Sequence, residues 1–369
     1  MKCGRMLGKG SFGVVYGICN TDKKIALKLT KRLHFAELLY WPSLQHQNIL
    51  PCLKVFNLTN EIGLVAFMIP RARMNLLEFS RTSNFKRSSQ SFSFLRSWMY
   101  QILNAVHFLH DLNLYHLDIS VLNVLLSSEL TAQLTDFGSV YHSVLDKCAV
   151  EDIGLPSIYC PPEVFRKTGR SASRLEKREI SPSSCDIYSV GILFLEVASN
   201  NCFRKKSLNK PVHRSFRNNV SLILRYLKEP AVFCKYLHQA FPAAAITSKD
   251  EILVADLIWS CIRTKITSRP SAKQLLRHEF LKEISSSPLN NNIEDKFGKN
   301  DNSSSGHSFE VKKLENIVEE INEHIPPNIK RTTELYQERH LLPLISDQKN
   351  SSTKHPPRLH SEDSLSLNI

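Results

Sequence analysis

The stretch His116-Leu-Asp-Ile-Ser-Val-Leu-Asn123, followed by Asp136-Phe-Gly138, decides how the rest of this chain is interpreted. It reads His-x-Asp-x-x-x-x-Asn, then an apolar run, then a second aspartate in front of Phe-Gly. The apolar run predicts a short hairpin, which would bring the two loops at its ends close together. Two carboxylates and one amide oxygen would then face a single site.

These two stretches, in this order, resemble the catalytic loop and the metal-binding triplet of eukaryotic protein kinases. The resemblance implies transfer of the γ-phosphoryl group of ATP to a protein hydroxyl, with Mg²⁺ required. It makes Asp118 the catalytic base or orienting group, and it makes Asn123 and Asp136 the metal ligands. His116 is expected to be structural and to pack on Phe137. Small-molecule phosphotransferases share His-x-Asp, so further matches are needed to separate the two classes.

A glycine-rich stretch lies near the N-terminus and reads Leu7-Gly-Lys-Gly-Ser-Phe-Gly-Val-Val-Tyr16. Gly8, Gly10 and Gly13 have the spacing G-x-G-x-x-G, which dinucleotide-binding folds also use. In those folds a helix follows the last glycine, whereas here β-branched and aromatic residues predict a strand. The stretch is therefore expected to be a strand–turn–strand flap, in which backbone N–H groups approach a phosphate without a Cβ in the way.

The short strand Ile25-Ala-Leu-Lys28 resembles the Val-Ala-Ile-Lys of kinases, whose lysine holds the α- and β-phosphates. A solvated lysine at a strand end is the alternative, but the position of Lys28 soon after Gly13 favours the phosphate role. Its expected partner is Glu37, on a helix predicted for residues 35–41, with a surface glutamate as the alternative. Lys28 and Glu37 are closer in sequence than is usual in the family, so this helix would have only about two turns.

The apolar run Gly63–Ile69 predicts a buried strand that ends at Pro70. By resemblance it is the last strand of the N-lobe, and backbone groups from Met68 to Arg71 would bind the adenine edge. The nucleotide-binding residues implied by the resemblance are Leu7, Gly8, Gly10, Gly13, Val15, Ala26, Lys28, Glu37, Met68 and Leu125. The run from Met68 to Leu76 also looks like the hinge of herpesvirus protein kinases, which suggests a viral enzyme.

Apolar residues recur at helical spacing from Phe92 to Asp111, which predicts a long core helix that leads to the catalytic loop. Matches further along the chain separate protein kinases from small-molecule phosphotransferases. Glu163 resembles the glutamate that closes the activation segment, and Arg269 the arginine that pairs with it. A Glu163–Arg269 ion pair is the expected consequence. Asp186 resembles the start of the central helix of the C-lobe.

Three positions depart from the family pattern. Leu117 stands where an arginine usually ties the catalytic loop to a phosphorylated activation segment, so activity is expected to be independent of that phosphorylation. Ser120 replaces the lysine of Ser/Thr kinases, and Pro156 lies roughly where they carry a threonine. Ser/Thr acceptors are still favoured, because nothing typical of tyrosine kinases precedes Glu163. A catalytically weak pseudokinase that binds partners is the alternative function.

Composition limits the class of protein. Hydrophobic residues make up 42% of the chain, enough for a real core, and none of the nine cysteines shows zinc-like spacing. We therefore expect a reduced, intracellular compartment, cytoplasmic or nuclear, and neither a signal peptide nor a membrane-spanning run is visible.

The net charge of +13 favours anionic partners such as a nucleotide. The basic run 166–178 is either a solvated loop or a docking site for an acidic partner; nucleic acid is not indicated.

The expected fold is α+β, the two-lobe protein kinase fold. An antiparallel β N-lobe with one helix is predicted for residues 1–69, and a mainly helical C-lobe for residues 70–283. Residues 284–369 begin rich in Ser, Asn and Asp and are predicted to be a largely disordered tail. An amphipathic helix is predicted within it at about residues 312–325.

Overall fold

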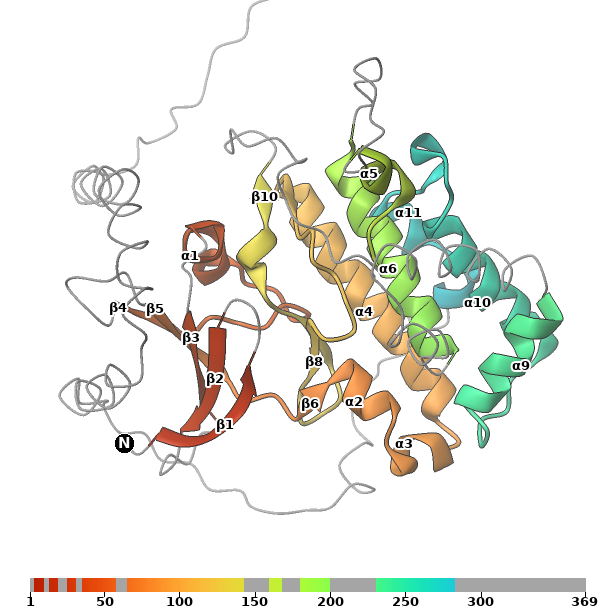
Figure 1. The fold of residues 1–369 in the computed structure, drawn as a ribbon. Helices are drawn as coiled ribbons and strands as arrows, with labels where there is room; N and C mark the ends of the chain where they lie inside the picture. The colour runs from red at the N-terminus through yellow and green to blue at the C-terminus, as the bar shows by residue number, and fades with distance from the viewer. Residues whose placement is uncertain are drawn as a thin grey trace, which may run out of the picture.

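The computed structural model describes residues 3–9, 13–18, 25–30, 35–57, 65–142, 159–167, 180–199 and 230–282. Within these residues the chain forms a β-sheet on one side and a group of helices on the other, with short strands between them (Figure 1). The tail 284–369 with its predicted helix at 312–325 lies outside the described residues. So do Gly10, Pro156 and the basic run beyond residue 167.

The larger sheet has five antiparallel strands in the order β1-β2-β3-β5-β4. Their bounds are β1 (Cys3–Lys9), β2 (Gly13–Ile18), β3 (Ile25–Thr30), β4 (Lys54–Asn57) and β5 (Val65–Pro70). β1 and β2 pair with each other, so the two strands predicted in the glycine-rich stretch are present; residues 10–12 between them lie outside the described residues. Gly13 has no space for a side chain, because a Cβ there would overlap the carbonyl oxygen of Leu29 on β3.

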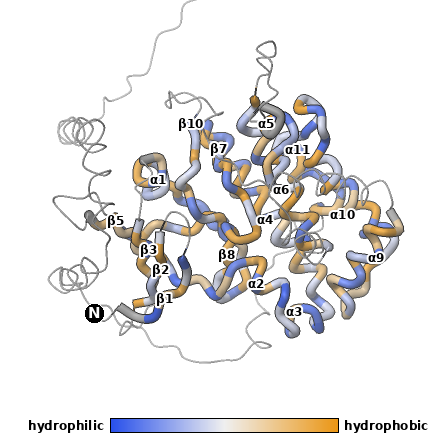
Figure 2. Tube along the Cα trace, in the orientation of Figure 1, coloured by the Kyte–Doolittle hydropathy of each residue, from blue (hydrophilic) through white to orange (hydrophobic). Residues whose placement is uncertain are grey.

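Residues along β3 and β5 alternate between two apolar clusters, as the twofold period of a strand requires. Ala26, Phe67 and Ile69 belong to the main core, which continues into the helices. Leu27, Leu29 and Ala66 form a separate cluster. Lys28 pairs directly with Phe67 in the register, so its side chain lies on the same face as Ala26. In Figure 2 the apolar colour runs through β3 and β5, whereas α3, at the edge of the helical part, is hydrophilic.

The helix after β3 is short, as predicted. α1 (Phe35–Tyr40) gives way to the 3₁₀ turn η1 (Trp41–Ser43), in which Pro42 occupies an early position. Proline favours a first turn but lacks the N–H that would continue the α-helical ladder behind it. The chain therefore turns away from α1 after Trp41.

Short strands hold the loops of the predicted site. β6 (Met74–Asn75) pairs with β8 (Val124–Leu126), and β8 pairs with β9 (Ala132–Leu134). The β8–β9 hairpin is the one predicted between Asn123 and Asp136. After the 3₁₀ turn η2 (Phe137–Ser139), β10 (Tyr141–His142) pairs with β7 (Leu114–Tyr115).

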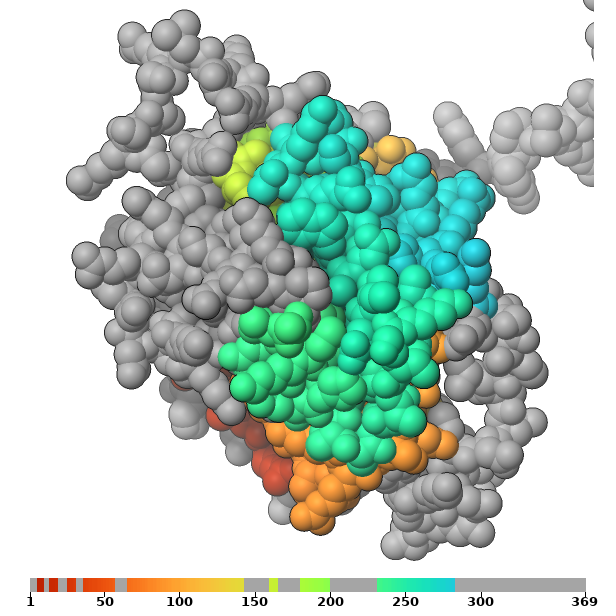
Figure 3. Space-filling view, turned by 90° about the vertical axis from the view of Figure 1, so that its right-hand side faces the viewer, coloured from red at the N-terminus to blue at the C-terminus, as the bar shows by residue number. Residues whose placement is uncertain are grey.

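The helical part is built around two buried helices, α4 and α6. α4 (Ser91–Asp111) matches the predicted core helix, and its predicted apolar positions are buried. α6 (Pro182–Ala198) is buried along nearly its whole length. The remaining elements are α2 (Leu76–Ser80), α3 (Ser83–Arg87), α5 (Pro162–Lys167), α9 (Pro230–Ala240), α10 (Ser248–Cys261), η4 (Ile266–Ser268), α11 (Ala272–Leu275) and η5 (Glu279–Leu281). From the helical side, α9 and α10 form much of the surface (Figure 3).

The sequence placed the start of the central helix at Asp186, but α6 begins at Pro182. Ser181 caps the helix by accepting a hydrogen bond from the N–H of Ser184, and proline follows at the first helical position. Both are favoured at helix starts. Asp186 therefore lies inside the helix, and its side chain is not the one that caps the helix start. Among the described residues, no helix is both long and apolar enough to cross a bilayer.

Candidate active site

Lys28 is the centre of a buried group of charges. Its Nζ atom lies 2.5 Å from Oε1 of Glu37 on α1 and 2.7 Å from Oδ1 of Asp136. Burial alone would lower the pKa of Lys28, but the two carboxylates beside it hold the pKa above its ordinary value. Lys28 therefore keeps its positive charge. The predicted Lys28–Glu37 contact is present, even though the sequence between the two residues is short.

Trp41 anchors the chain directly after the short helix that carries Glu37. The indole is fully buried, and its Nε1–H donates a hydrogen bond of 2.7 Å to the carbonyl oxygen of Leu50. Its ring stacks on Phe137 at 5.8 Å, and the Nζ atom of Lys28 lies 5.6 Å from the ring centroid. Such a cation–π contact adds to the attraction that fixes the lysine. No local sequence pattern indicates these distant partners of Trp41.

Asn123 closes the catalytic loop onto Asp118. Its Nδ2 atom donates to both the backbone oxygen and the Oδ2 atom of Asp118, each at 2.8 Å. These bonds use both amide hydrogens, so the Oδ1 atom of Asn123 remains an acceptor. Burial, followed by the negative charge of Asp136, raises the pKa of Asp118 to about 7. The loop thus presents a half-buried carboxylate in a fixed orientation.

Asp186 on α6 fixes the backbone of the catalytic loop. Its fully buried carboxylate accepts the backbone N–H groups of His116 and Leu117, each at 2.8 Å. The Nε2 atom of His110 lies 3.0 Å from the same carboxylate. Leu117 has a φ of 57°, a left-handed backbone that non-glycine residues adopt at a cost of order 1–3 kcal/mol. The bonds to Asp186 hold that conformation. The sequence identified Asp186 only as a helix signature.

His116 has a structural role, as predicted. The ring lies 5.1 Å from that of Phe137, and burial lowers the pKa of His116, which favours the neutral form. Its Nδ1 atom accepts the N–H of Asp118 at 3.2 Å, and its Nε2–H can therefore donate to the carbonyl oxygen of Thr135 at 3.0 Å. One uncharged imidazole thus connects the loop of Asp118 with the residue before Asp136.

The residues present fit a magnesium ion. The Oδ1 atom of Asn123 and the carboxylate of Asp136 are hard oxygen donors, the kind that Mg²⁺ prefers in proteins. Asp136 has a left-handed φ of 68°, which the Lys28 contact helps to hold. The N–H of Thr135 donates to the carbonyl oxygen of Asn123 at 2.9 Å, so the two candidate ligands sit on directly bonded segments.

Three other residues predicted to bind the nucleotide are Val15 on β2, Met68 on β5 and Leu125 on β8. Val15 pairs with Lys28 across β2 and β3, and Leu125, half-buried on β8, pairs with Asn75. The side chain of Met68 packs with the cluster of Leu27, away from the face that carries Lys28, so only its backbone can face a nucleotide on that side. Its carbonyl oxygen also accepts the N–H of Leu53 at 2.8 Å. A carbonyl oxygen can accept a second hydrogen bond, so the backbone of Met68 stays a predicted contact of the adenine edge.

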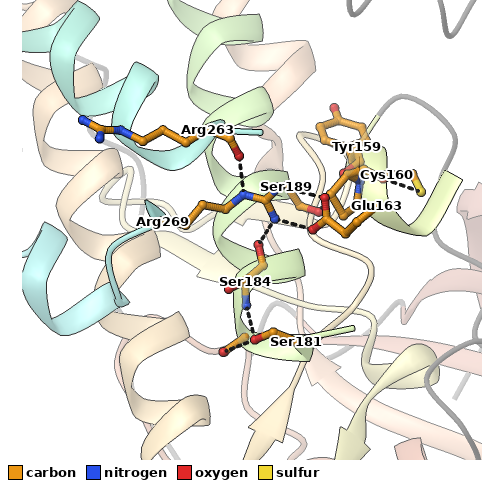
Figure 4. A network of polar contacts seen from close by, with 10 residues as sticks. Tyr159, Cys160, Glu163, Ser181, Ser184, Ser189, Arg263 and Arg269 are labelled. Carbon is orange, nitrogen blue, oxygen red and sulfur yellow. Dashed lines mark hydrogen bonds and ion pairs between the residues drawn. The ribbon is translucent and has the colours of Figure 1, made fainter. Parts of the chain in front are cut away.

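The predicted Glu163–Arg269 ion pair is present and buried (Figure 4). The guanidinium donates to both carboxylate oxygens, at 2.6 and 2.9 Å. It also donates to the carbonyl oxygens of Arg263 at 2.7 Å and Ser184 at 3.0 Å. One side chain thus joins α5, the start of α6 and the loop before η4. A guanidinium that binds both oxygens of one carboxylate makes a stronger ion pair than a single contact does and fixes the relative orientation of the two side chains.

Tyr159, just before α5, fixes the end of the activation segment to two other elements. Its hydroxyl donates to the buried carboxylate of Glu196 on α6 and accepts the N–H of Val121 in the catalytic loop at 3.4 Å. Its carbonyl oxygen accepts the hydroxyl of Ser189 at 3.0 Å. The sequence did not single out Tyr159 or Glu196 as a pair, since they are distant along the chain.

Leu117 lies in an apolar cluster where the family has a charged side chain. It is fully buried and packs with Cys160, Val164 and Cys185, with Tyr115 and Tyr141 at the margin. Cys160 and Cys185 are buried free thiols and serve here as small apolar side chains. The cluster joins the catalytic loop to the residues on both sides of the undescribed segment 143–158.

Comparisons with known proteins agree with this geometry. The family model described as the protein kinase domain matches residues 1–281, so the chain belongs to the protein kinase family. It is 27% identical to serine/threonine-protein kinase plk-1 of Caenorhabditis elegans, over 76% of this chain and 39% of that protein. It is 26% identical to the probable serine/threonine-protein kinase mkcF of Dictyostelium discoideum, over 78% of this chain and 37% of that protein. The chain thus spans well under half the length of these relatives. The two-lobe fold is that of the family.

Proposed function

We propose that the chain is an active protein kinase that transfers the γ-phosphoryl group of ATP to serine or threonine hydroxyls of proteins. The observation that carries the proposal is the joining of four side chains into one site. Lys28 contacts Asp136 at 2.7 Å, and Asn123 contacts Asp118 at 2.8 Å. The Thr135–Asn123 backbone bond connects the two pairs. The similarity to relatives named as serine/threonine kinases supports the choice of acceptor.

Each residue has a role in this proposal. Lys28 binds the phosphates of ATP and is held by Glu37. Asp118 orients the acceptor hydroxyl and accepts its proton, and Asn123 keeps that carboxylate in position. Asn123 and Asp136 hold Mg²⁺, which neutralises charge on the phosphates when it is bound.

The same proposal covers the nucleotide pocket and the lobes. Gly8, Gly10 and Gly13 would let the flap between β1 and β2 lie over the phosphates, with Leu7 beside it. Val15, Ala26 and Leu125 would enclose the adenine. The backbone from Met68 to Arg71 would bind its edge. The proposed boundary between the two lobes lies between residues 69 and 70, and the proposed C-terminal tail begins at residue 284.

A catalytically weak pseudokinase is the alternative function. Its support is Ser120, a buried short side chain in place of the lysine that contacts the γ-phosphate in Ser/Thr kinases. The two functions differ in a direct assay. Incubation with radiolabelled ATP and a mixed protein substrate should give Mg²⁺-dependent phosphoserine and phosphothreonine. Label that appears only on tyrosine would contradict the acceptor class, and label at the level of a heat-inactivated sample would favour the pseudokinase.

The apolar cluster of Leu117 predicts activity without phosphorylation of the activation segment. In this chain no arginine stands beside Asp118 to bind a phosphate there, and packing replaces that contact. Treatment of the purified chain with a phosphatase should therefore change kcat by less than about twofold. Complete dephosphorylation is checked by mass spectrometry of the intact protein. A large loss of activity that returns on rephosphorylation would contradict this prediction.

Finer predictions from the sequence remain proposals. They are a viral origin, a cytoplasmic or nuclear location in the host cell, and an acidic partner for the basic run 166–178. The two relatives reported above, from Caenorhabditis elegans and Dictyostelium discoideum, are matched over part of their length. Substrates and partners of the whole protein are therefore left to experiment.

A further inference from the structure

The catalytic loop exposes one large apolar side chain beside the reacting groups. In residues 114–127, all of which the structure describes, Leu122 is the only exposed residue, with 47% of its surface accessible. Its neighbours Ile119 and Val121 are fully buried. The loop therefore offers an incoming polypeptide two polar groups, those of Asp118 and Asn123, and the side chain of Leu122.

Leu122 is held close to the acceptor position. The Cα atoms of neighbouring residues are about 3.8 Å apart, so Leu122 directly adjoins Asn123, whose amide lies 2.8 Å from the Asp118 carboxylate. The N–H of Asn123 donates to the carbonyl oxygen of Ser120 at 3.1 Å, which makes residues 120–123 a closed turn. The N–H of Val121 is bound to the Tyr159 hydroxyl. The backbone on both sides of Leu122 is thus fixed, so the position from which its side chain extends is set by the loop.

We propose that Leu122 is a specificity-determining residue, which selects protein substrates that carry a large apolar side chain close to the acceptor hydroxyl. The inference rests on the proposed kinase function. A hydroxyl that reaches Asp118 brings the flanking residues of its chain past Leu122. A leucine at that place gains free energy by removing apolar surface from water and offers nothing to a charged side chain. An acidic residue there would instead attract lysine or arginine.

The test is a position-scanning peptide library in which Ser or Thr is fixed and each flanking position is varied. The wild-type chain should show one flanking position at which large apolar residues raise kcat/KM about tenfold over charged ones, the lower end of what one or two buried methylene groups contribute. Leu122→Glu should remove that preference and replace it with one for lysine or arginine at the same position. Leu122→Met should retain the apolar preference.

A matched control separates a local effect from a general one. Leu112 is also an exposed leucine, 44% accessible, but it follows α4 outside the catalytic loop. Leu112→Glu should leave the peptide preferences unchanged. ATP binding by calorimetry should be similar in all variants, which shows that Leu122→Glu has not distorted Asn123.

The outcomes distinguish this inference from the function beneath it. A wild-type chain that phosphorylates peptides without an apolar preference, or a Leu122→Glu variant that keeps one, overturns the role of Leu122 and leaves the kinase function standing. A wild-type chain that phosphorylates neither the library peptides nor any protein overturns both the role of Leu122 and the kinase function.

Discussion

Replacing Asp118 with asparagine is expected to lower kcat about 10²–10⁴-fold, the contribution of a positioned acid or base group. The amide has nearly the same shape as the carboxylate but cannot accept the proton of the acceptor hydroxyl. It also lacks the negative charge that orients that hydroxyl. The measurement is the steady-state rate of peptide phosphorylation at saturating Mg²⁺ and ATP, with the KM for ATP determined in parallel.

The loss should fall on the chemical step and not on nucleotide binding. Lys28, Glu37 and Asp136 make their contacts without the Asp118 side chain, so the KM for ATP should change by less than about threefold. Asp111→Asn is the matched control, because Asp111 is exposed at the end of α4. An Asp118→Asn variant with more than half the wild-type rate would show that another group performs this role.

Breaking the Glu163–Arg269 ion pair from one side is expected to lower the free energy of unfolding by about 3–5 kcal/mol. Both side chains are buried, so Glu163→Gln leaves the guanidinium charge without a counterion. Arg269→Met would leave the carboxylate of Glu163 buried and unpaired, together with the carbonyl oxygens of Arg263 and Ser184. Urea unfolding followed by circular dichroism measures the change.

Two further variants make the result specific. The double variant Glu163→Gln, Arg269→Met should be less destabilised than the sum of the single variants, because neither charge is then buried alone. Glu279→Gln breaks the exposed pair with Lys249, where the nitrogen–oxygen distance is 2.9 Å, and should have little effect. If Glu163→Gln were no more destabilising than Glu279→Gln, the buried pair would have no special role in stability.

The local sequence patterns predicted most of the elements that hold the site. Apolar spacing gave α4 and the run that becomes β5. The glycine spacing followed by β-branched residues correctly predicted two paired strands. The helix of Glu37 was correctly predicted to be short. These features depend on neighbouring residues, which is why one sequence is enough to predict them.

The sequence could not reveal the contacts that join distant segments. The buried Asp186 carboxylate binds the backbone at His116 and Leu117, and nothing around Asp186 in sequence indicates those partners. The same holds for Trp41, whose ring meets Phe137 and Lys28 only after the chain has folded.

The departure at Leu117 is also understood only in three dimensions. As a sequence feature it is the absence of an arginine. In the structure it is an apolar contact with Cys160, Val164 and Cys185, which gives the loop a different means of attachment. The expected independence from phosphorylation therefore has a physical basis that the substitution alone did not supply.

The central claim is that Lys28, Asp118, Asn123 and Asp136 surround a single molecule of ATP with Mg²⁺. Isothermal titration calorimetry of the full chain with ATP, with and without Mg²⁺, tests it most directly, with Asp136→Asn as the variant. We expect saturable binding by the wild type that strengthens with Mg²⁺, and binding at least about tenfold weaker in Asp136→Asn when Mg²⁺ is present. A wild-type chain that releases no heat of binding with ATP, or that binds it equally well without Mg²⁺ and without the Asp136 carboxylate, would contradict the account.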